Sequence, residues 1–190
     1  MSGARRMRSN DANCRAAEAR DEEPKRSLKP EKARERVMAT ALKMLAARAC
    51  SEQQLRERLL QKAWTTPALV DECLARLKEL GYINDEQFAR SYAASRLSLR
   101  AVGRSRVARE LKTKKVARET ISNALDEVFE EVSEEALIER AIAKRIRTHG
   151  QPTDRASAKR LFDHLARLGF GYDLIIRKLR ALRAEIEEEG

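Results

Sequence analysis

Side chains that could carry out catalysis or bind metal are few in this chain, and they are scattered. The two histidines, His149 and His164, have no nearby residues that would complete a nucleophilic triad or supply metal ligands at the usual spacing. Asp85 and Glu86 are adjacent acids at an expected helix start, where capping explains them. Neither a GxxxxGK[ST] nor a GxGxxG segment occurs. We predict a protein that is not an enzyme and that uses no metal and no cofactor.

Cysteine usage and apolar runs bear on the compartment. Cys14, Cys50 and Cys73 are odd in number and lack CxxC spacing, which favours reduced structural cysteines and argues against zinc. No run approaches the length of about 18 apolar residues that a membrane-spanning helix needs. The first residues include arginines but no apolar segment of the kind found in signal peptides. We therefore expect a cytoplasmic protein with no membrane association.

Positive charge is the chemistry that this sequence does offer. The 190 residues include 40 Lys and Arg against 30 Asp and Glu, a formal net charge of +10. Such a balance points to a polyanionic partner, whether nucleic acid, an anionic membrane or an acidic protein surface. Between Asp85 and Arg118 there are ten basic and three acidic residues. We predict that these ten make electrostatic contacts with a partner, with arginine favoured for paired contacts to phosphate or carboxylate: Arg90, Arg96, Arg100, Arg104, Arg106, Arg109, Lys112, Lys114, Lys115 and Arg118.

Charge alternates in blocks beyond this stretch. Residues 119–135 contain seven acids and no base, and residues 136–183 contain twelve bases and four acids. We interpret the acidic stretch as a hinge region between two basic blocks. Ordinary solvated helix surface, with acids complementing helix starts, is the alternative interpretation.

The elements that carry these charges are expected to be helices. Aromatic residues make up 4% of the chain and charged residues 37%, a composition rich in helix formers. Ser51 predicts a helix start, with Gln54 in a capping-box position, and the pair Thr66-Pro67 predicts another. Gly81 predicts a left-handed helix stop, and Asp85 the next N-cap, with Phe88 at the third helical position.

The spacing of apolar residues repeats along the chain. Steps of four and five recur in one helix of each unit: Leu55–Leu59–Trp64, Val107–Leu111–Val116 and Leu161–Leu165–Phe170. Steps of four and three recur in the next helix: Val70–Leu74–Leu77, Ile121–Leu125–Val128 and Ile175–Leu179–Leu182. The pattern predicts an all-α fold of three tandem three-helix repeats, stacked as an elongated, curved body. The expected boundaries are 36–83, 84–132 and 133–184, after a disordered charged tail (1–35) and before an acidic tail (185–190).

Two segments of the middle unit resemble a known family. They are LxxLGYINDEQFARSY at Leu77–Tyr92 and, in the pattern GxxRxxxEL, Gly103, Arg106, Glu110 and Leu111. With SEQQLRERLL from Ser51, the chain resembles the RecX family of bacterial recombination regulators over about residues 36–182. It departs where the family commonly has Lys-Gly before an aliphatic residue, because Lys115 stands at the glycine position, and lysine adopts a positive φ only at a steric cost.

The resemblance implies both a fold and a function. The fold is an all-helical, three-repeat, elongated body, and the function is to bind the RecA recombinase and its filament on single-stranded DNA. The bound regulator would damp the ATPase, strand-exchange and co-protease activities of RecA. Weak direct DNA binding and a monomeric state are further expectations. The alternatives are a basic helical protein that binds nucleic acid without a RecA target, and a scaffold whose charge serves only solubility.

Overall fold

The helix start and stop signals of the sequence divide the chain into short helices. The computed structural model describes residues 30–189, and of residues 185–189 it describes only the backbone. Within that range the chain forms helices and no strand. The helices are α1 (Pro30–Ala47), α2 (Glu52–Leu60), α3 (Pro67–Glu79), α4 (Asp85–Leu99), α5 (Arg104–Thr113), α6 (Arg118–Glu131), α7 (Glu134–His149), α8 (Arg155–Leu168) and α9 (Tyr172–Glu189).

Three of the predicted helix ends are confirmed, two by a capping hydrogen bond and one by its backbone conformation. The Ser51 hydroxyl accepts from the Gln54 N–H at 3.2 Å and caps α2. The Thr66 hydroxyl caps α3, with Pro67 in its first turn. Gly81 has a φ of +74° just after α3, where glycine takes a left-handed conformation without a steric penalty. These local signals were enough to place the helix ends.

The predicted cap of α4 was wrong by one residue. Asn84, not Asp85, is the N-cap, and its side chain accepts from the Gln87 N–H at 2.9 Å. The Asp85 carboxylate instead accepts from the backbone N–H of Glu52, at 2.8 Å, in a different unit of the fold. Asn84 already satisfies the start of its own helix, which leaves Asp85 available to cap its neighbour.

Both ends of the described chain are more helical than the sequence indicated. Helix α1 begins at Pro30, inside the range 1–35 that we expected to be disordered, because proline is well suited to a first helical position. The rest of that range, with Cys14, lies outside the described residues. At the other end α9 continues to Glu189, so the backbone of the predicted acidic tail is helical up to that residue.

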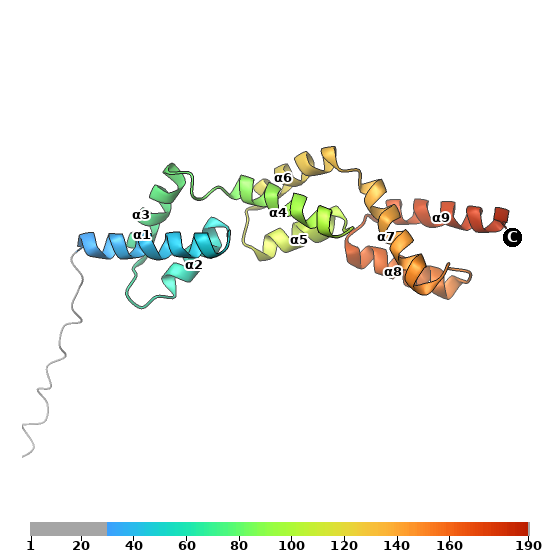
Figure 1. Ribbon diagram of the computed structural model, residues 1–190, viewed down its shortest axis with the longest axis horizontal. Coiled ribbons are helices and arrows are strands. Elements are labelled where there is room, and N and C mark those ends of the chain that lie inside the picture. The colour runs from blue at the N-terminus through green and yellow to red at the C-terminus, as the bar shows by residue number, and fades with distance from the viewer. Residues whose placement is uncertain (1–29, 190) are drawn as a thin grey trace, which may run out of the picture.

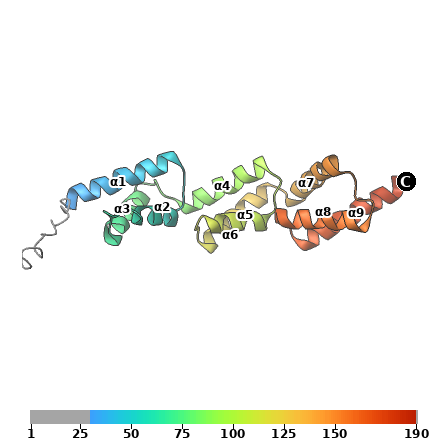
Figure 2. The same cartoon turned by 90° about the horizontal axis from the view of Figure 1, so that it is seen from below.

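The helices group into three units arranged in a row, as the repeat predicted. Unit one is α1–α3, unit two is α4–α6 and unit three is α7–α9, in sequence along the long axis (Figure 1). In the turned view, the first helix of each unit lies along one edge and the other two lie along the opposite edge (Figure 2). The repeated positions Leu55, Leu111 and Leu165 are each fully buried. The chain is therefore elongated, with each unit contacting its neighbours in the sequence.

The acidic stretch is not a connecting hinge. Most of it forms α6, whose apolar residues Ile121, Leu125 and Val128 are buried in unit two. Its acids lie on the outer face, and two of them, Asp126 and Glu127, form ion pairs with arginines of α5 and α4. The helical period puts the acids opposite the apolar stripe, which makes this stretch a structural part of unit two.

The apolar core is divided unevenly among the three units. Unit one has a cluster of its own, which includes Val37, Leu59 and Leu74, with the sole tryptophan, Trp64, packed against it. Units two and three share one continuous cluster. The contact between units one and two therefore depends on polar groups, whereas apolar burial also contributes to the contact between units two and three.

Candidate partner-contact surface

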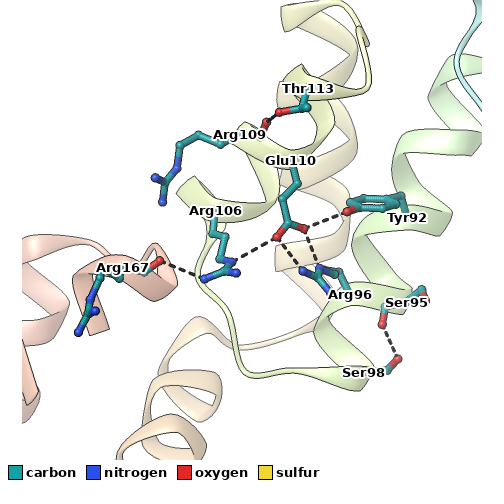
Figure 3. A network of polar contacts seen from close by, with 9 residues as sticks. All are labelled: Tyr92, Ser95, Arg96, Ser98, Arg106, Arg109, Glu110, Thr113 and Arg167. Atoms are coloured by element: carbon teal, nitrogen blue, oxygen red, sulfur yellow. Dashed lines mark hydrogen bonds and ion pairs between the residues drawn. The ribbon is translucent and has the colours of Figure 1, made fainter. Parts of the chain in front are cut away.

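The predicted contact arginines surround one carboxylate in unit two. Glu110, on α5, accepts hydrogen bonds from the Tyr92 hydroxyl at 3.0 Å and from two nitrogens of Arg96 at 2.7 and 2.8 Å (Figure 3). Arg106, one turn before Glu110 on the same helix, donates from Nε at 3.2 Å. Arg96 and Tyr92 both come from α4, so the network joins the first two helices of the unit.

The network fixes the ionisation of its central group. The hydrogen bonds from Arg96 lower the pKa of Glu110 from 4.5 to about 2, with further contributions from Tyr92 and Arg106. Burial alone would raise it, since desolvation disfavours a charged carboxylate. Glu110 therefore stays ionised at neutral pH, and Arg96 and Arg106 serve the fold of unit two.

Arg106 also connects unit two to unit three. Its Nη1 atom donates to the Arg167 carbonyl, at 3.3 Å, at the end of α8 (Figure 3). Beside it, the Gly103 N–H donates to the Leu168 carbonyl at 2.9 Å. A Cβ atom at Gly103 would lie 2.4 Å from the carbonyl group of Gly169, so the two backbones touch. Gly103, Arg106 and Glu110, which carry the GxxRxxxEL resemblance, thus have structural roles at this contact.

Five of the ten predicted contact residues pair with acids of the chain. Arg96 and Arg106 pair with Glu110. The other three pairs lie on the surface: Arg90 with Glu127 at 2.8 Å, Arg104 with Asp126 at 2.6 Å, and Lys115 with Glu57 at 3.5 Å. Part of the positive charge that the sequence concentrates in this stretch is therefore neutralised within the fold.

The other five predicted residues differ in their surroundings. The Lys114 ammonium lies over the Tyr92 ring, 4.8 Å from its centroid, and burial lowers its pKa. Among the described residues, the Arg109 side chain donates only to the Ser105 carbonyl of its own helix. Within residues 30–189, the side chains of Arg100, Lys112 and Arg118 have no hydrogen-bond or ion-pair partner, and all three are exposed. These three and Arg109 are the predicted residues that are free to meet a partner.

Three further cations, Arg140, Lys144 and Arg147 of α7, were not among the predicted residues. They line a groove of about 830 Å³ together with Arg100. Their spacing of four and three residues places them on one helical face. That spacing was visible in the sequence and could have singled them out within the third unit.

The remaining groups that could do chemistry do not assemble into a centre. His164 is half-buried, and burial together with the positive charge of Arg145 lowers its pKa. Among residues 30–189 no group of three or more His, Cys, Asp or Glu side chains could hold a metal ion. None of the helices in that range is both long enough and apolar enough to cross a membrane.

Comparisons with known proteins match the first two units to one family. Residues 38–77 match the model described as the first three-helix domain of RecX, and residues 84–125 match the second. The regulatory protein RecX of Streptomyces coelicolor is 33% identical over 156 residues, which cover 82% of this chain and 80% of that protein. The chain belongs to the RecX family. The RecX proteins of Thermobifida fusca (31% identical, 93% and 92% covered) and Deinococcus radiodurans (34%, 93% and 81%) are similar over all three units.

Solved structures show the same RecX architecture. The crystal structure of RecX from Lactobacillus salivarius superposes with a TM-score of 0.72 at 18% identity, over 81% of this chain and 99% of that one. A second, described as regulatory protein RecX, superposes with a TM-score of 0.67 at 19% identity, over 76% and 70%. At these identities the likeness establishes the fold, and it agrees with the three helical units.

Proposed function

We propose that this RecX-family protein binds the RecA recombinase and its filament on single-stranded DNA, and inhibits the ATPase, strand-exchange and co-protease activities of RecA. The observation that supports this most strongly is the likeness to proteins named as regulators along nearly the whole chain, 93% of it in the Thermobifida fusca relative. The protein would act in the cytoplasm by contact alone, without catalysis.

The shape and charge of the molecule agree with this proposal. A row of three units can lie along a filament and touch several of its subunits at once (Figure 1). Arg109, Lys112 and Arg118 project from α5 and α6 of the central unit and make no ion pair with acids of residues 30–189. Exposed cations without internal partners can pair with acidic groups of another protein at little cost to the fold.

The first experiment is to measure ATP hydrolysis by RecA on single-stranded DNA while this protein is added. We expect inhibition. Inhibition well below one molecule per RecA subunit would indicate action at filament ends, and inhibition near equal amounts would indicate coating of the filament. No inhibition at any ratio by the folded protein would contradict the proposal and leave the nucleic-acid-binding and scaffold alternatives.

The contact residues can be tested with charge reversals that spare the fold. Changing Arg109, Lys112 and Arg118 to Glu should weaken inhibition by about tenfold or more, because each reversal replaces attraction by repulsion at an acidic surface. The control carries Lys32→Glu, Lys43→Glu and Lys62→Glu in unit one, which change the net charge equally at residues that are exposed and make no side-chain ion pair within the described residues. Arg104 and Arg106 are unsuitable, because reversing them breaks internal pairs. Full inhibition by the reversed variant would rule out these three residues as the contacts.

A further inference from the structure

A groove between units two and three gathers positive charge from both. Its walls are the end of α4, where Arg100 and Leu99 lie, and the face of α7 that carries Arg140, Lys144 and Arg147. His164 of α8 also lines it. Arg140 donates to the Leu97 carbonyl at 3.0 Å, which fixes α7 against the end of α4. The groove is thus held in place by the contact between the two units.

The lining of this groove contains no internal counter-charge from the described residues. None of the residues that line it is acidic. Within residues 30–189, no carboxylate pairs with Arg100, Lys144 or Arg147, whereas Arg177 and Lys178 on α9 pair with Glu135 and Glu139. Charges of one sign that line a hollow reinforce each other's field and concentrate anions there.

The geometry points to a site for the phosphate backbone of a single nucleic-acid strand, and we propose that this groove binds one. Successive turns of a helix place side chains about 5–6 Å apart, so Arg140, Lys144 and Arg147 can each meet a different phosphate along a strand. Arg100 faces them from the opposite wall. The site would serve the proposed function, but its test needs no recombinase.

The apolar part of the lining favours a single strand over a duplex. Leu99 is 74% exposed at the groove, with Leu168 and Ala101 beside it, and such surface suits sugars and unpaired bases. No Phe, Tyr or Trp side chain lines the groove, and the rings among its lining residues are the imidazoles of His149 and His164, which offer bases little surface for stacking. Binding should therefore depend on salt and be indifferent to sequence.

The test is fluorescence anisotropy with a labelled 20-nucleotide single strand and the full-length protein alone, over a range of salt. We compare the wild type with the triple variant Arg100→Gln, Lys144→Gln and Arg147→Gln. The variant should bind about tenfold or more weakly at low salt. Because each phosphate contact contributes about 0.7 to the slope of log affinity against log salt for single strands, its slope should fall by about 2.

The control removes the same charge elsewhere. The Gln variant of Lys32, Lys43 and Lys62 lowers the net charge equally and should change affinity less than twofold. Equal weakening by the two variants would overturn the proposal, because it would mean that net charge alone drives binding. Circular dichroism checks that both are folded, and the single change Lys144→Gln, with an expected loss of about threefold and a smaller slope, keeps the test decisive if the triple variant unfolds.

Competition separates the other sources of phosphate. An unlabelled single strand should displace the probe, and the matching duplex should do so at least tenfold more weakly. Displacement by the duplex at lower concentration, or by ATP at micromolar concentration, would overturn the assignment to a single strand. Loss of strand binding with intact inhibition of RecA would separate this site from the proposed function.

Discussion

The two places where neighbouring units meet share one pattern of hydrogen bonds and differ in how closely the units pack. We call the contact of units one and two the first joint, and that of units two and three the second joint. In the first, the Ser51 hydroxyl donates to the Lys114 carbonyl at 2.5 Å, and the Glu52 N–H donates to Asp85. In the second, the Gly103 N–H donates to the Leu168 carbonyl, and the Arg104 N–H donates to Glu134 at 3.1 Å.

The correspondence holds position by position in the repeat. Ser51 and Gly103 are both the N-cap of the second helix of their unit. Asp85 and Glu134 are both the first residue of the following unit's first helix, and each carboxylate accepts from the start of its neighbour's second helix. An acid there satisfies an otherwise unpaired N–H and also complements the helix dipole.

The difference between the joints lies at the N-cap residue. At the first joint a serine side chain stands between the two backbones, and the apolar cores stay separate. At the second joint, Gly103 lets the two backbones touch. The Ser105 N–H also donates to the Gly169 carbonyl there at 3.2 Å, and the apolar core is continuous across the joint. The glycine and the shared core thus occur at the same joint, and the close backbone approach there leaves no room for a side chain at residue 103.

The sharpest way to break the second joint is Gly103→Ala. Its φ of −83° suits any residue, so the cost comes only from the Cβ colliding with Gly169, which we expect to lower the free energy of unfolding by about 3 kcal/mol. Urea unfolding followed by circular dichroism measures it. Trp64 reports on unit one alone, and its fluorescence transition should stay near the wild-type midpoint.

The matched control for that change is Gly81→Ala. Gly81 has a φ of +74° and nothing within 4 Å of an added Cβ, so only backbone strain of about 1 kcal/mol is expected. If Gly103→Ala cost no more than Gly81→Ala, the close approach of the two backbones would be refuted.

The next largest effect should come from Glu110→Gln, which weakens the network that supports the second joint. We expect a loss of about 2 kcal/mol at pH 7, since the amide cannot match a carboxylate's bonds to two arginines. Because folding lowers the pKa of Glu110 from 4.5 to about 2, its stabilisation is complete above pH 4.5 and disappears as the pH falls towards 2.

This pH dependence is checked by urea unfolding of the wild type and the variant at several pH values. The difference in stability between them should shrink steadily below pH 4.5. A difference that stays constant down to pH 2 would mean that Glu110 is not held ionised by its neighbours.

At the first joint, Asp85→Ala should cost about 1 kcal/mol, the usual value of a lost cap. The free energy of unfolding of Asp85→Asn should lie within about 0.5 kcal/mol of wild type, because the amide oxygen can still accept the hydrogen bond from the Glu52 N–H. Burial raises the pKa of Asp85, so acidification through its titration range favours the folded state, opposite to Glu110. Thermal unfolding followed by Trp64 fluorescence measures the stability of both variants. A large loss of stability in Asp85→Asn would contradict the interpretation that Asp85 acts as a hydrogen-bond acceptor for the Glu52 N–H.

The smallest effect is a stabilisation by Lys115→Gly. Lys115 has a φ of +63° at the end of α5, and the corresponding position at the end of α8 is Gly169. Because glycine adopts a positive φ without a steric penalty, the change should raise the free energy of unfolding by about 1 kcal/mol. The lost ion pair with Glu57 is exposed and contributes little. Lys112→Gly, inside the helix, should instead cost about 1 kcal/mol. Thermal unfolding distinguishes the two, and destabilisation by Lys115→Gly would show that the pair outweighs the strain.

The two outer ends of the row satisfy their own groups. In unit one the Lys62 carbonyl, which corresponds to Lys114, accepts from the Thr65 hydroxyl at 2.9 Å. In unit three, Asp154 and Ser157 form a capping box that closes the start of α8. The groups that form the joints between units are therefore satisfied internally at both ends of the row.

The sequence foretold most of the fold but only part of the candidate site. Apolar spacing predicted burial at Val107 and Leu111, because a helix repeats its environment every three to four residues. The distribution of charge in the sequence located the basic stretch as well. The sequence could not separate Arg96, which is bound to Glu110, from Arg118, which makes no ion pair with the described residues, because such pairing depends on which faces of different helices meet.

The sequence by itself determined the helices, their repeat and the excess of positive charge, since these depend on local propensity and composition. Only the tertiary structure decided which charges are neutralised, that Asp85 caps a helix of another unit, and that Gly103 permits a shared core. The physical reason is the sequence separation of the interacting residues: a helix cap or an apolar stripe depends on residues within one or two helical turns. An ion pair or a backbone crossing between units is settled by residues tens of positions apart, whose approach depends on the whole packing.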